Sequence, residues 1–431
     1  TDALLQQSTA AKSAVSVLGE KNGTLMIGNS SFDTEKNINE LELGGGTISY
    51  DAETHTLTLN GVNIEDSSHD WVIDFNDMDT LLNLVLVGKN ILEGHGGISA
   101  PKLKISGNGS LQITATDFDG IAGAGQSEEN LTIGSDVDIT AMNGCAIVFN
   151  GSVRIEQDAT VKAKCRYSGI DCYDLTIDSA TEVNLESTEE KCNAINVHGN
   201  NDGTVAGTAN IKNSKLVLKA HYPAFYAKDG IEIIGGNIEA KSTSDVGIFT
   251  KGKLSITDAG IDASGYYYGI CSNGAMEMTG GKLKAVGQNN GVYIRNNLTI
   301  KGNAKVHVSG YQGIDSDGQT TIGEADIEIA SMDFSIVYPV QIENGNKILS
   351  LMGGKDKESA TVLNPDDFVW DRPDPNCIGK NAYLHIITGS VAGPDETPDP
   401  DAGYDAGSAA GGAIAAVAVG GAAIWGGYEI A

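Results

Sequence analysis

Short triplets in which an apolar, a polar and an apolar residue alternate recur along this chain. One series includes Leu103–Ile105, Leu131–Ile133 and Leu298–Ile300, and a second includes Leu111–Ile113 and Val306–Val308. Such alternation is typical of half-buried β-strands whose apolar ends point inward. Gly, Asn, Asp and Ser fill the intervals, where turns need positive φ or local side-chain hydrogen bonds. The pattern predicts many short strands joined by tight turns.

A second signal, a small residue followed by an apolar one, sets the period of the repeat. Gly247–Ile248 and Gly269–Ile270 are examples, and each of the last four steps, from Ile248 to Ile336, is 22 residues long. Earlier steps are longer, and the largest insertion lies between Asn200 and Thr208. Three short strands per coil of about 22 residues predict an all-β, right-handed parallel β-helix, a solenoid that needs a cap at each end.

The period divides the chain into five segments. We expect an N-terminal cap or extension at 1–46, with a short helix from Asp2 to Leu18, and the parallel β-helix at 47–337. A turn-rich C-terminal cap at 338–390 precedes an acidic Gly/Pro linker at 391–412 and an apolar tail at 413–431. The apolar run of the tail is too short for an ordinary transmembrane helix, so no membrane span is predicted.

Charge narrows the classes of partner. The chain carries 28 Lys and Arg residues against 57 Asp and Glu residues, which gives a formal net charge of −29. Phosphate groups would be repelled, so nucleic acid and anionic lipid are poor partners. Aromatic residues make up only 6% of the chain while glycine occurs 55 times, as expected for thin, repetitive β-layers.

One segment resembles a known family. The run Ile48–Gly61, followed by Leu84–Ile91 and Leu103–Leu111, resembles the opening motif of the carbohydrate-binding β-helix domains that Gram-positive anaerobes display on their surface. The resemblance covers roughly residues 45–335, and Ser49 stands where the family often has tryptophan. It implies an extracellular, non-enzymatic protein of the bacterial cell surface, an adhesin with calcium and acidic or cellulosic polysaccharides as ligands.

The C-terminal segment of the chain also resembles a known kind of sequence. Gly420–Ala431 is similar to the lead-in to S-layer-homology-like domains that anchor proteins to the cell wall. Three interpretations of the tail remain: no role, insertion into lipid, or addition as a β-strand to another copy, which would produce a filament. The candidate assembly residues are apolar or aromatic, namely Ile414, Val417, Val419, Ile424, Trp425 and Tyr428.

Aromatic residues recur at one place in the repeat. Three residues before the repeat isoleucine, aromatic side chains alternate with Gly144, Cys192, Asp245 and Asn289. A spacing of two coils is about 9.6 Å, which suits successive disaccharides of an extended cell-wall glycan or other polysaccharide. The alternative is that the rings merely cover the turns. The candidate carbohydrate-binding residues are Phe118, Tyr167, Tyr222, Tyr266, Tyr267, Tyr268 and Tyr311.

Acidic turns and cysteines offer weaker candidates. Asp117 with Asp119, or Asp136 with Asp138, could bind Ca²⁺ together with turn carbonyls, or they are simply solvated. Cys165 and Cys192 face each other if neighbouring turns stack, and this position permits a disulfide. The alternative is that the cysteines are small buried fillers.

A β-helix also raises the alternative of a calcium-dependent polysaccharide lyase or hydrolase. Arg166 lies near Asp171 and Asp174 in sequence, and Arg295 lies one coil before Asp315. A lyase needs a base beside clustered carboxylates, and a galacturonan hydrolase needs a compact group of aspartates. The sequence has neither a paired-arginine motif nor an aspartate triad followed by Gly-His-Gly. We therefore predict a non-enzymatic protein.

Overall fold

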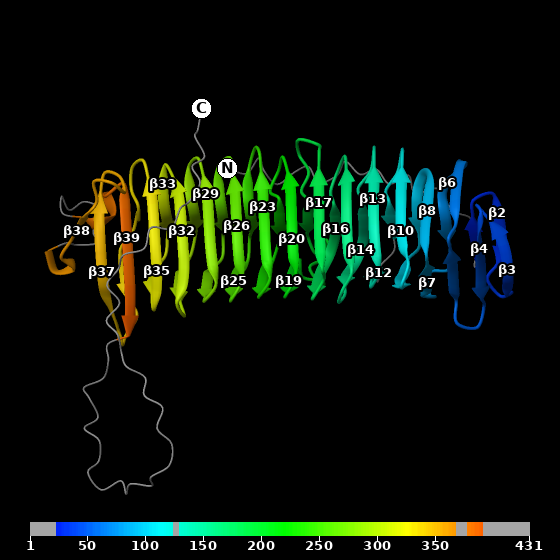
Figure 1. Cartoon of the computed structure of the whole chain (residues 1–431), viewed down its shortest axis with the longest axis horizontal. Coiled ribbons are helices and arrows are strands. Elements are labelled where there is room, and N and C mark those ends of the chain that lie inside the picture. Colours follow the sequence, from blue (N-terminus) through cyan, green and yellow to red (C-terminus); the bar gives the residue numbers. More distant parts are fainter. Residues whose placement is uncertain (1–22, 124–128, 368–376, 391–431) are drawn as a thin grey trace, which may run out of the picture. The chain divides into compact units, whose positions relative to one another are not determined.

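The computed structural model describes residues 23–123, 129–367 and 377–390 (Figure 1). Their strands wind into a parallel β-solenoid of about 12 turns with about 22 residues per turn. Within these ranges the helical elements are two single 3₁₀ turns, η1 (Pro365–Asp367) and η2 (Ile378–Lys380). The predicted fold class is confirmed, including three strands in each regular coil.

Three parallel sheets, which we call A, B and C, form the walls of the solenoid. Each coil crosses sheet A, turns into sheet B and returns along sheet C. The strands of sheet A are the first parts of β6 (Asn63–Phe75) and β8 (Lys89–Ser99), then β10 (Ser110–Ala115), β13 (Asp136–Ala141), β15 (Thr160–Cys165), β17 (Glu182–Ser187), β20 (Lys215–Ala220), β23 (Asn237–Ser242), β26 (Gly260–Gly265), β29 (Lys282–Gly287), β32 (Ala304–Gly310) and β35 (Ala325–Ser331).

Sheet B has the shortest strands. It consists of the last parts of β6 and β8, then β11 (Ile121–Ala122), the first parts of β14 (Ile147–Ile155) and β16 (Ile170–Asp178), β18 (Ile195–Val197), β21 (Phe225–Ala227), β24 (Val246–Thr250), β27 (Tyr268–Ser272), β30 (Asn290–Ile294) and β33 (Gln312–Ser316). Its inward residues pair in direct register from coil to coil, as Ile195 pairs with Phe225 and Phe225 with Ile248.

Sheet C closes each coil. It consists of β5 (Thr56–Asn60), β7 (Leu82–Val87), β9 (Lys102–Gly107), β12 (Glu129–Ile133), the second parts of β14 and β16, β19 (Thr208–Lys212), β22 (Gly230–Ile234), β25 (Lys253–Thr257), β28 (Met276–Thr279), β31 (Leu298–Lys301), β34 (Thr320–Ile322) and β36 (Val340–Ile342). Figure 1 views the solenoid from the side of sheet A, whose strands point upward while later coils lie further left. The chain returns behind this sheet, so the solenoid is right-handed.

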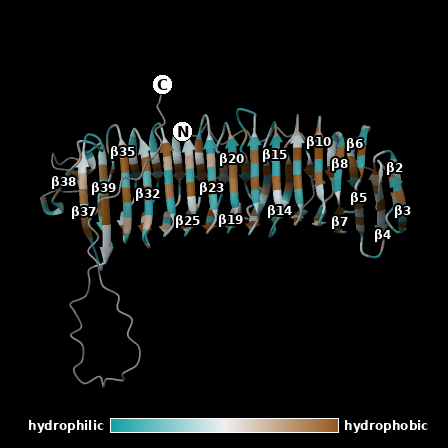
Figure 2. Ribbon diagram, in the orientation of Figure 1, coloured by the Kyte–Doolittle hydropathy of each residue, from teal (hydrophilic) through white to brown (hydrophobic). Residues whose placement is uncertain are grey.

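The core is a stack of aliphatic side chains. Ile170, Ile195, Phe225 and Ile248 are 0% exposed, and each rests on the side chain of the next coil. Burying one such side chain stabilises the fold by about 1.5–3 kcal/mol. Figure 2 shows the resulting alternation of hydrophobic and hydrophilic bands along the strands.

The glycine that precedes many of the inward residues of sheet B has a steric cause. A Cβ atom on Gly247 would lie 2.7 Å from the carbonyl oxygen of Gly269, and one on Gly120 would lie 2.3 Å from a side-chain carbon of Ile139. The turn from sheet A to sheet B therefore brings backbone and core too close together for a larger side chain at these positions. This close approach explains the Gly–Ile signature of the repeat.

Antiparallel strands cover both ends of the solenoid. At the N-terminal end, β1 (Thr24–Ile27) pairs with β2 (Ser30–Asp33) and with β6 (Asn63–Phe75), and β3 (Ile38–Leu43) pairs with β4 (Gly46–Asp51). At the C-terminal end, β39 (Tyr383–Ser390) lies antiparallel between β35 and β37 (Asn346–Gly354), with β38 (Thr361–Val362) at the margin.

Three predicted features lie outside the described residues. They are the helix from Asp2 to Leu18, the linker at 391–412 and the tail at 413–431 with its six assembly residues. Within the described residues, no helix has the length and apolar character needed to cross a membrane.

Candidate functional site

The turns from sheet A to sheet B stack into one continuous border, which we call the A–B edge. Tyr167 donates its backbone N–H to the carbonyl of Gly144 over 3.1 Å, and Tyr267 donates to Asp245 over 3.0 Å. Asn289 donates in turn to Tyr267 over 3.0 Å. Aromatic and non-aromatic residues therefore alternate along this edge from coil to coil, as predicted.

The predicted aromatic residues differ in how far they reach into solvent. Tyr266 and Tyr267 are each 45% exposed, and Tyr311 is 53% exposed. The four others, Phe118, Tyr167, Tyr222 and Tyr268, are half-buried against the turns. Exposed rings gather in the C-terminal coils, so the candidate binding surface is concentrated there.

Four tyrosines form a contact chain, which we call the tyrosine cluster. The ring centroids of Tyr266 and Tyr267 are 5.0 Å apart, and those of Tyr267 and Tyr268 are 6.5 Å apart. Tyr268 stacks on Tyr293 of the next coil at 5.3 Å with an interplanar angle of 27°. The cluster extends the aromatic surface from the A–B edge onto the outer face of sheet B.

Sequence reasoning missed Tyr293 and the related pair Tyr226–Phe249, whose centroids are 5.5 Å apart. Each of these rings directly follows an inward residue of sheet B, such as Val292 before Tyr293. In the sequence they read as ordinary outward positions of a strand. A comparison of this outward position across successive coils would have found these rings.

Hydrogen-bonding groups surround the tyrosine cluster. The Tyr293 hydroxyl donates to Asp317 Oδ2 over 3.2 Å, and Asn290 Nδ2 donates to Asp315 Oδ2 over the same distance. Burial raises the pKa of Tyr293 and that of Tyr268, so both hydroxyls keep their protons near neutral pH. The surface therefore combines flat apolar faces with donors and acceptors at their rims.

A second aromatic group lies near the N-terminal end of the same edge. Trp71 lies over Gly96, where a Cβ atom would come within 2.6 Å of the indole, and it stacks on Phe118 at 5.9 Å and 27°. Asp117 and His95 flank these rings, and we call the four residues the tryptophan cluster. Sequence reasoning missed Trp71 because the pairing of β6 with β8 shifts register between Asp66 and Trp71, which breaks the repeat there.

Both ring nitrogens of His95 face acceptors. Nδ1 lies 2.6 Å from Asp117 Oδ2, and Nε2 lies 3.0 Å from the carbonyl oxygen of Ser67. The hydrogen bond to Asp117, aided by that to Ser67, raises the pKa of His95. The same contact, with a hydrogen bond from Thr116, lowers the pKa of Asp117. The imidazole is thus held as a fixed donor beside the aromatic pair.

Arg166 does not meet the carboxylates expected for a lyase. Its Nε lies 2.9 Å from Glu189 Oε2, its Nη1 lies 3.1 Å from Asn143 Oδ1, and its guanidinium covers the Tyr167 ring at 5.4 Å. Asp171 instead contacts Asn196 and His198 over 2.8 and 2.9 Å, respectively.

Asp174, the other aspartate near Arg166 in sequence, also has a partner: it accepts a hydrogen bond from Thr208. Arg295 is an exposed residue on the coil of the tyrosine cluster, and Asp315 of the next coil accepts from Asn290. The arginines named in the lyase hypothesis are thus placed at the aromatic surface rather than inside a group of carboxylates.

The four predicted calcium ligands lie in two places. Asp117 and Asp119 belong to an A–B turn, and Asp119 Oδ1 accepts from the Cys145 amide over 2.7 Å. Asp136 and Asp138 belong to β13 in sheet A, where Asp136 Oδ1 accepts from the Thr160 amide over 3.1 Å. In the described ranges, no three His, Cys, Asp or Glu side chains group closely enough to hold a metal ion.

Cys165 and Cys192 do not form the disulfide that stacked turns would permit. All six cysteines are free thiols. Cys165 ends β15 and points into the solenoid, where its Sγ lies 3.3 Å from the carbonyl oxygen of Tyr167. Burial raises the pKa of Cys165 to about 12 and that of Cys192 to about 11. Cys165 therefore acts as a small buried filler, whereas Cys192 is half-buried in its turn.

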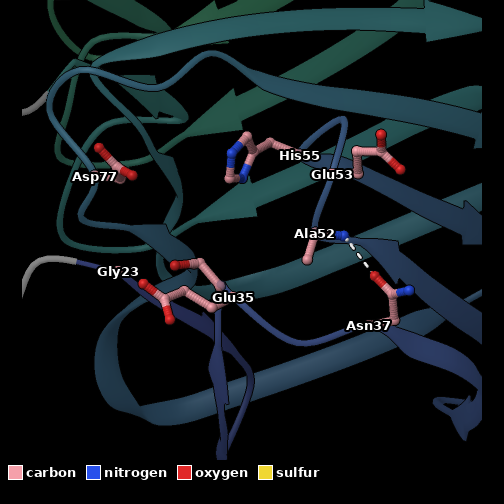
Figure 3. A pocket seen from close by; sticks show the side chains of 8 residues that line it. Gly23, Glu35, Asn37, Ala52, Glu53, His55 and Asp77 are labelled. Carbon is pink, nitrogen blue, oxygen red and sulfur yellow. Dashed lines mark hydrogen bonds between the residues drawn. The ribbon is translucent and has the colours of Figure 1, made fainter.

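A separate hollow of about 640 Å³ lies beside β4 and the turns next to it (Figure 3). Glu35, Glu53 and Asp77 line it together with His55, whose Nδ1 is hydrogen-bonded to the buried Tyr50 hydroxyl over 2.8 Å. Among the described residues, its lining is acidic and has no aromatic ring other than the imidazole of His55. It has the character of a solvated acidic hollow and does not extend the aromatic surface.

Comparisons with protein-family models, with curated proteins and with solved structures gave no match for this chain. The resemblance of residues 45–335 to surface-displayed β-helix domains therefore stays a prediction. The A–B edge and its two aromatic clusters are the features of this chain that indicate a ligand.

Proposed function

We propose that this protein is a non-enzymatic, extracellular β-solenoid of the bacterial cell surface that binds a polysaccharide along its A–B edge. The observation that carries the proposal is the exposed tyrosine cluster with Tyr311 one coil further on. Tyrosine presents a large, rigid ring with a polar tip, which is well suited to a ligand that has both apolar faces and hydroxyl groups. Sugar rings have this combination.

The electrostatics favour a neutral glycan. The chain has a formal net charge of −29, and Asp245, Asp315 and Asp317 lie beside the tyrosine cluster. An anionic polymer would meet repulsion there, whereas a neutral polysaccharide can donate its hydroxyl hydrogens to the carboxylates. The exposed Arg295 adds a donor for the oxygen atoms of the ligand.

Cell-surface location and self-assembly are further parts of the proposal. Their support is the resemblance of residues 45–335 and of the tail to surface proteins, together with the apolar character of 413–425. Electron microscopy of the full chain beside the variant V417D/V419D tests assembly through the tail. Filaments from the first but not from the second are expected, and short single particles from both would remove this part of the proposal.

Affinity electrophoresis tests polysaccharide binding. The native chain is run through gels that contain hydroxyethyl cellulose, glucomannan, galactomannan or arabinoxylan, with polygalacturonate as the anionic comparison. We expect retardation by at least one neutral polymer and none by polygalacturonate. Repeating each gel with Ca²⁺ or with a chelator tests the calcium expectation, and an assay for reducing ends should show no depolymerisation.

The matched variants are Tyr267→Ala on the edge and Tyr338→Ala, which removes a tyrosine that is 39% exposed beyond the last A–B turn. Tyr267→Ala should reduce retardation at least about tenfold, as truncating an aromatic anchor does. Tyr338→Ala should leave retardation unchanged. Equal effects of the two substitutions, or no retardation by any polymer, would contradict the proposal.

A further inference from the structure

The tryptophan cluster resembles the tyrosine cluster in two respects. In both, an aromatic residue two positions before the inward residue of sheet B, Trp71 or Tyr268, stacks on a ring of a later coil with an interplanar angle of 27°. In both, polar groups that already have partners border the rings, namely Asp117 with His95 and Asp317 with Tyr293. The chain thus has two similar aromatic surfaces far apart in sequence.

The two clusters lie on one line. His95 and Phe118 occupy the A–B turns of consecutive coils, as the backbone hydrogen bond from Phe118 N to the His95 carbonyl oxygen (2.8 Å) shows. The same chain of turn-to-turn contacts leads through Tyr167 to Tyr267. Six coil steps separate the coil of Ile121 from that of Ile270, which at about 4.8 Å per step is about 29 Å.

Half-buried aromatic side chains continue between the clusters. Tyr167 lies under the Arg166 guanidinium, and Tyr222 occupies the corresponding turn two coils further on. A ligand that runs parallel to the solenoid axis would meet the Arg166 guanidinium over Tyr167 and, two coils further on, the ring of Tyr222. A short sugar, by contrast, would cover only one cluster.

We propose that the tryptophan cluster is a second binding subsite, and that the ligand is an extended neutral polysaccharide chain that contacts both clusters at once. This inference rests on the proposed polysaccharide binding and adds the length and orientation of the ligand. Two linked subsites raise the overall affinity because the second contact forms within the complex, and the gain is commonly 10²–10⁴-fold. The ligand chain lies along the A–B edge, with sheet A and sheet C left free.

The experiment measures affinity against ligand length with the full chain. Calorimetry is carried out with an oligosaccharide series cut from the polymer that retards the native protein, from the disaccharide up to the longest soluble chain. We expect weak binding of short members and a rise of at least about 100-fold once the ligand spans both clusters. Trp71→Ala and Tyr267→Ala should each remove that rise and still bind short members at the cluster that remains.

Controls separate loss of binding from loss of folding. Trp71→Phe keeps an aromatic ring over Gly96 and should retain most of the length dependence, and circular dichroism checks that each variant is folded. Affinity that does not rise with length, or Trp71→Ala binding long ligands as the native chain does, would overturn the second subsite while leaving the proposed function in place. Failure of every polymer and oligosaccharide to bind would instead overturn the proposed function itself.

Discussion

The outer face of sheet A and the A–B edge are built on the same coils, yet they expose different kinds of side chain. On sheet A, charges of opposite sign face each other between coils: Lys164 lies 2.8 Å from Glu186, Lys215 lies 2.7 Å from Glu182, and Lys284 lies 3.1 Å from Asp262. The A–B edge also has ion pairs, such as that of Arg166 with Glu189, but exposed rings, such as those of Tyr267 and Tyr311, reach into solvent beside them.

This difference indicates which surface is free to bind. Charges that are already paired gain little from a new ligand, and exposed ion pairs themselves contribute only about 0.2–1 kcal/mol each. Exposed rings such as Tyr267, by contrast, leave apolar area in water that a ligand can cover. Sheet A thus presents a solvated, charged face, and the A–B edge is the surface at which we propose that the ligand binds.

Both surfaces depend on the shared core, so a core substitution is expected to have the largest effect. Phe225 is 0% exposed and stacks between Ile195 and Ile248. Phe225→Ala should lower the free energy of unfolding by about 3–5 kcal/mol because it leaves a cavity. Denaturant unfolding followed by circular dichroism measures this change, and a loss below about 1 kcal/mol would contradict the stacked-core description.

The A–B edge should also be the more pH-sensitive of the two regions. Burial raises the pKa of Asp119 from its ordinary value of 3.8 to about 6, so the folded state binds a proton more tightly than the unfolded state does. The resulting stabilisation is complete below about pH 3.8 and is lost as the pH rises through about 6. Asp245 should change stability with pH in the same direction, because burial raises its pKa to about 6 as well.

Asp119→Asn tests this directly, since an amide oxygen can still accept from the Cys145 N–H. Above pH 7 the variant should be more stable than the native chain by about 1–3 kcal/mol, and at pH 4 the difference should nearly vanish. Unfolding curves at pH 4, 6 and 8 give the comparison. A variant that is less stable at pH 8 would show that the ionised carboxylate stabilises this turn.

Binding and stability should separate at the edge. Tyr267 is nearly half exposed, so Tyr267→Ala should change the unfolding free energy by less than about 0.5 kcal/mol while polysaccharide binding falls at least about tenfold. The matched variant on sheet A is Lys284→Ala, which should leave binding unchanged. If Lys284→Ala weakened binding as much as Tyr267→Ala, the division between the two surfaces would be wrong.

The smallest effect is expected from a single ion pair of sheet A. Lys164 is exposed, and its contact with Glu186 is screened by solvent. Lys164→Met removes the charge but keeps most of the side-chain length, so stability should fall by about 0.5 kcal/mol or less, and by less still in high salt. A loss above about 1.5 kcal/mol would show that the ladder of charges is a structural element in its own right.

Periodicity was sufficient to predict the fold. The recurring Gly–Ile steps and the apolar–polar–apolar triplets predict three strands per coil, and the register of Ile248 with Ile270 follows from the 22-residue step. The turn position of Phe118, Tyr167, Tyr222, Tyr267 and Tyr311 was likewise predictable, because a fixed place in the repeat is a fixed place in space.

Contacts that break the period were not predictable. Trp71 reaches Phe118 only because β6 shifts register and Gly96 leaves room for the indole. Of the two interpretations of Cys165 and Cys192, the disulfide is absent, because proximity along a repeat does not specify where a sulfur atom points. Arg166 likewise finds Glu189 in the adjacent turn rather than Asp171, its neighbour in sequence.

Hydroxyl-radical footprinting with mass spectrometry tests the central claim most directly, namely that the A–B edge is where a polysaccharide binds. The full chain is oxidised with and without the neutral polymer that retards it most. The polymer is expected to protect Tyr266, Tyr267, Tyr311 and Trp71 from oxidation. Two control residues, Tyr338 beyond the last A–B turn and His307 on sheet A, should be oxidised equally in both samples. Protection at His307 or Tyr338 without protection of the edge tyrosines would contradict the account.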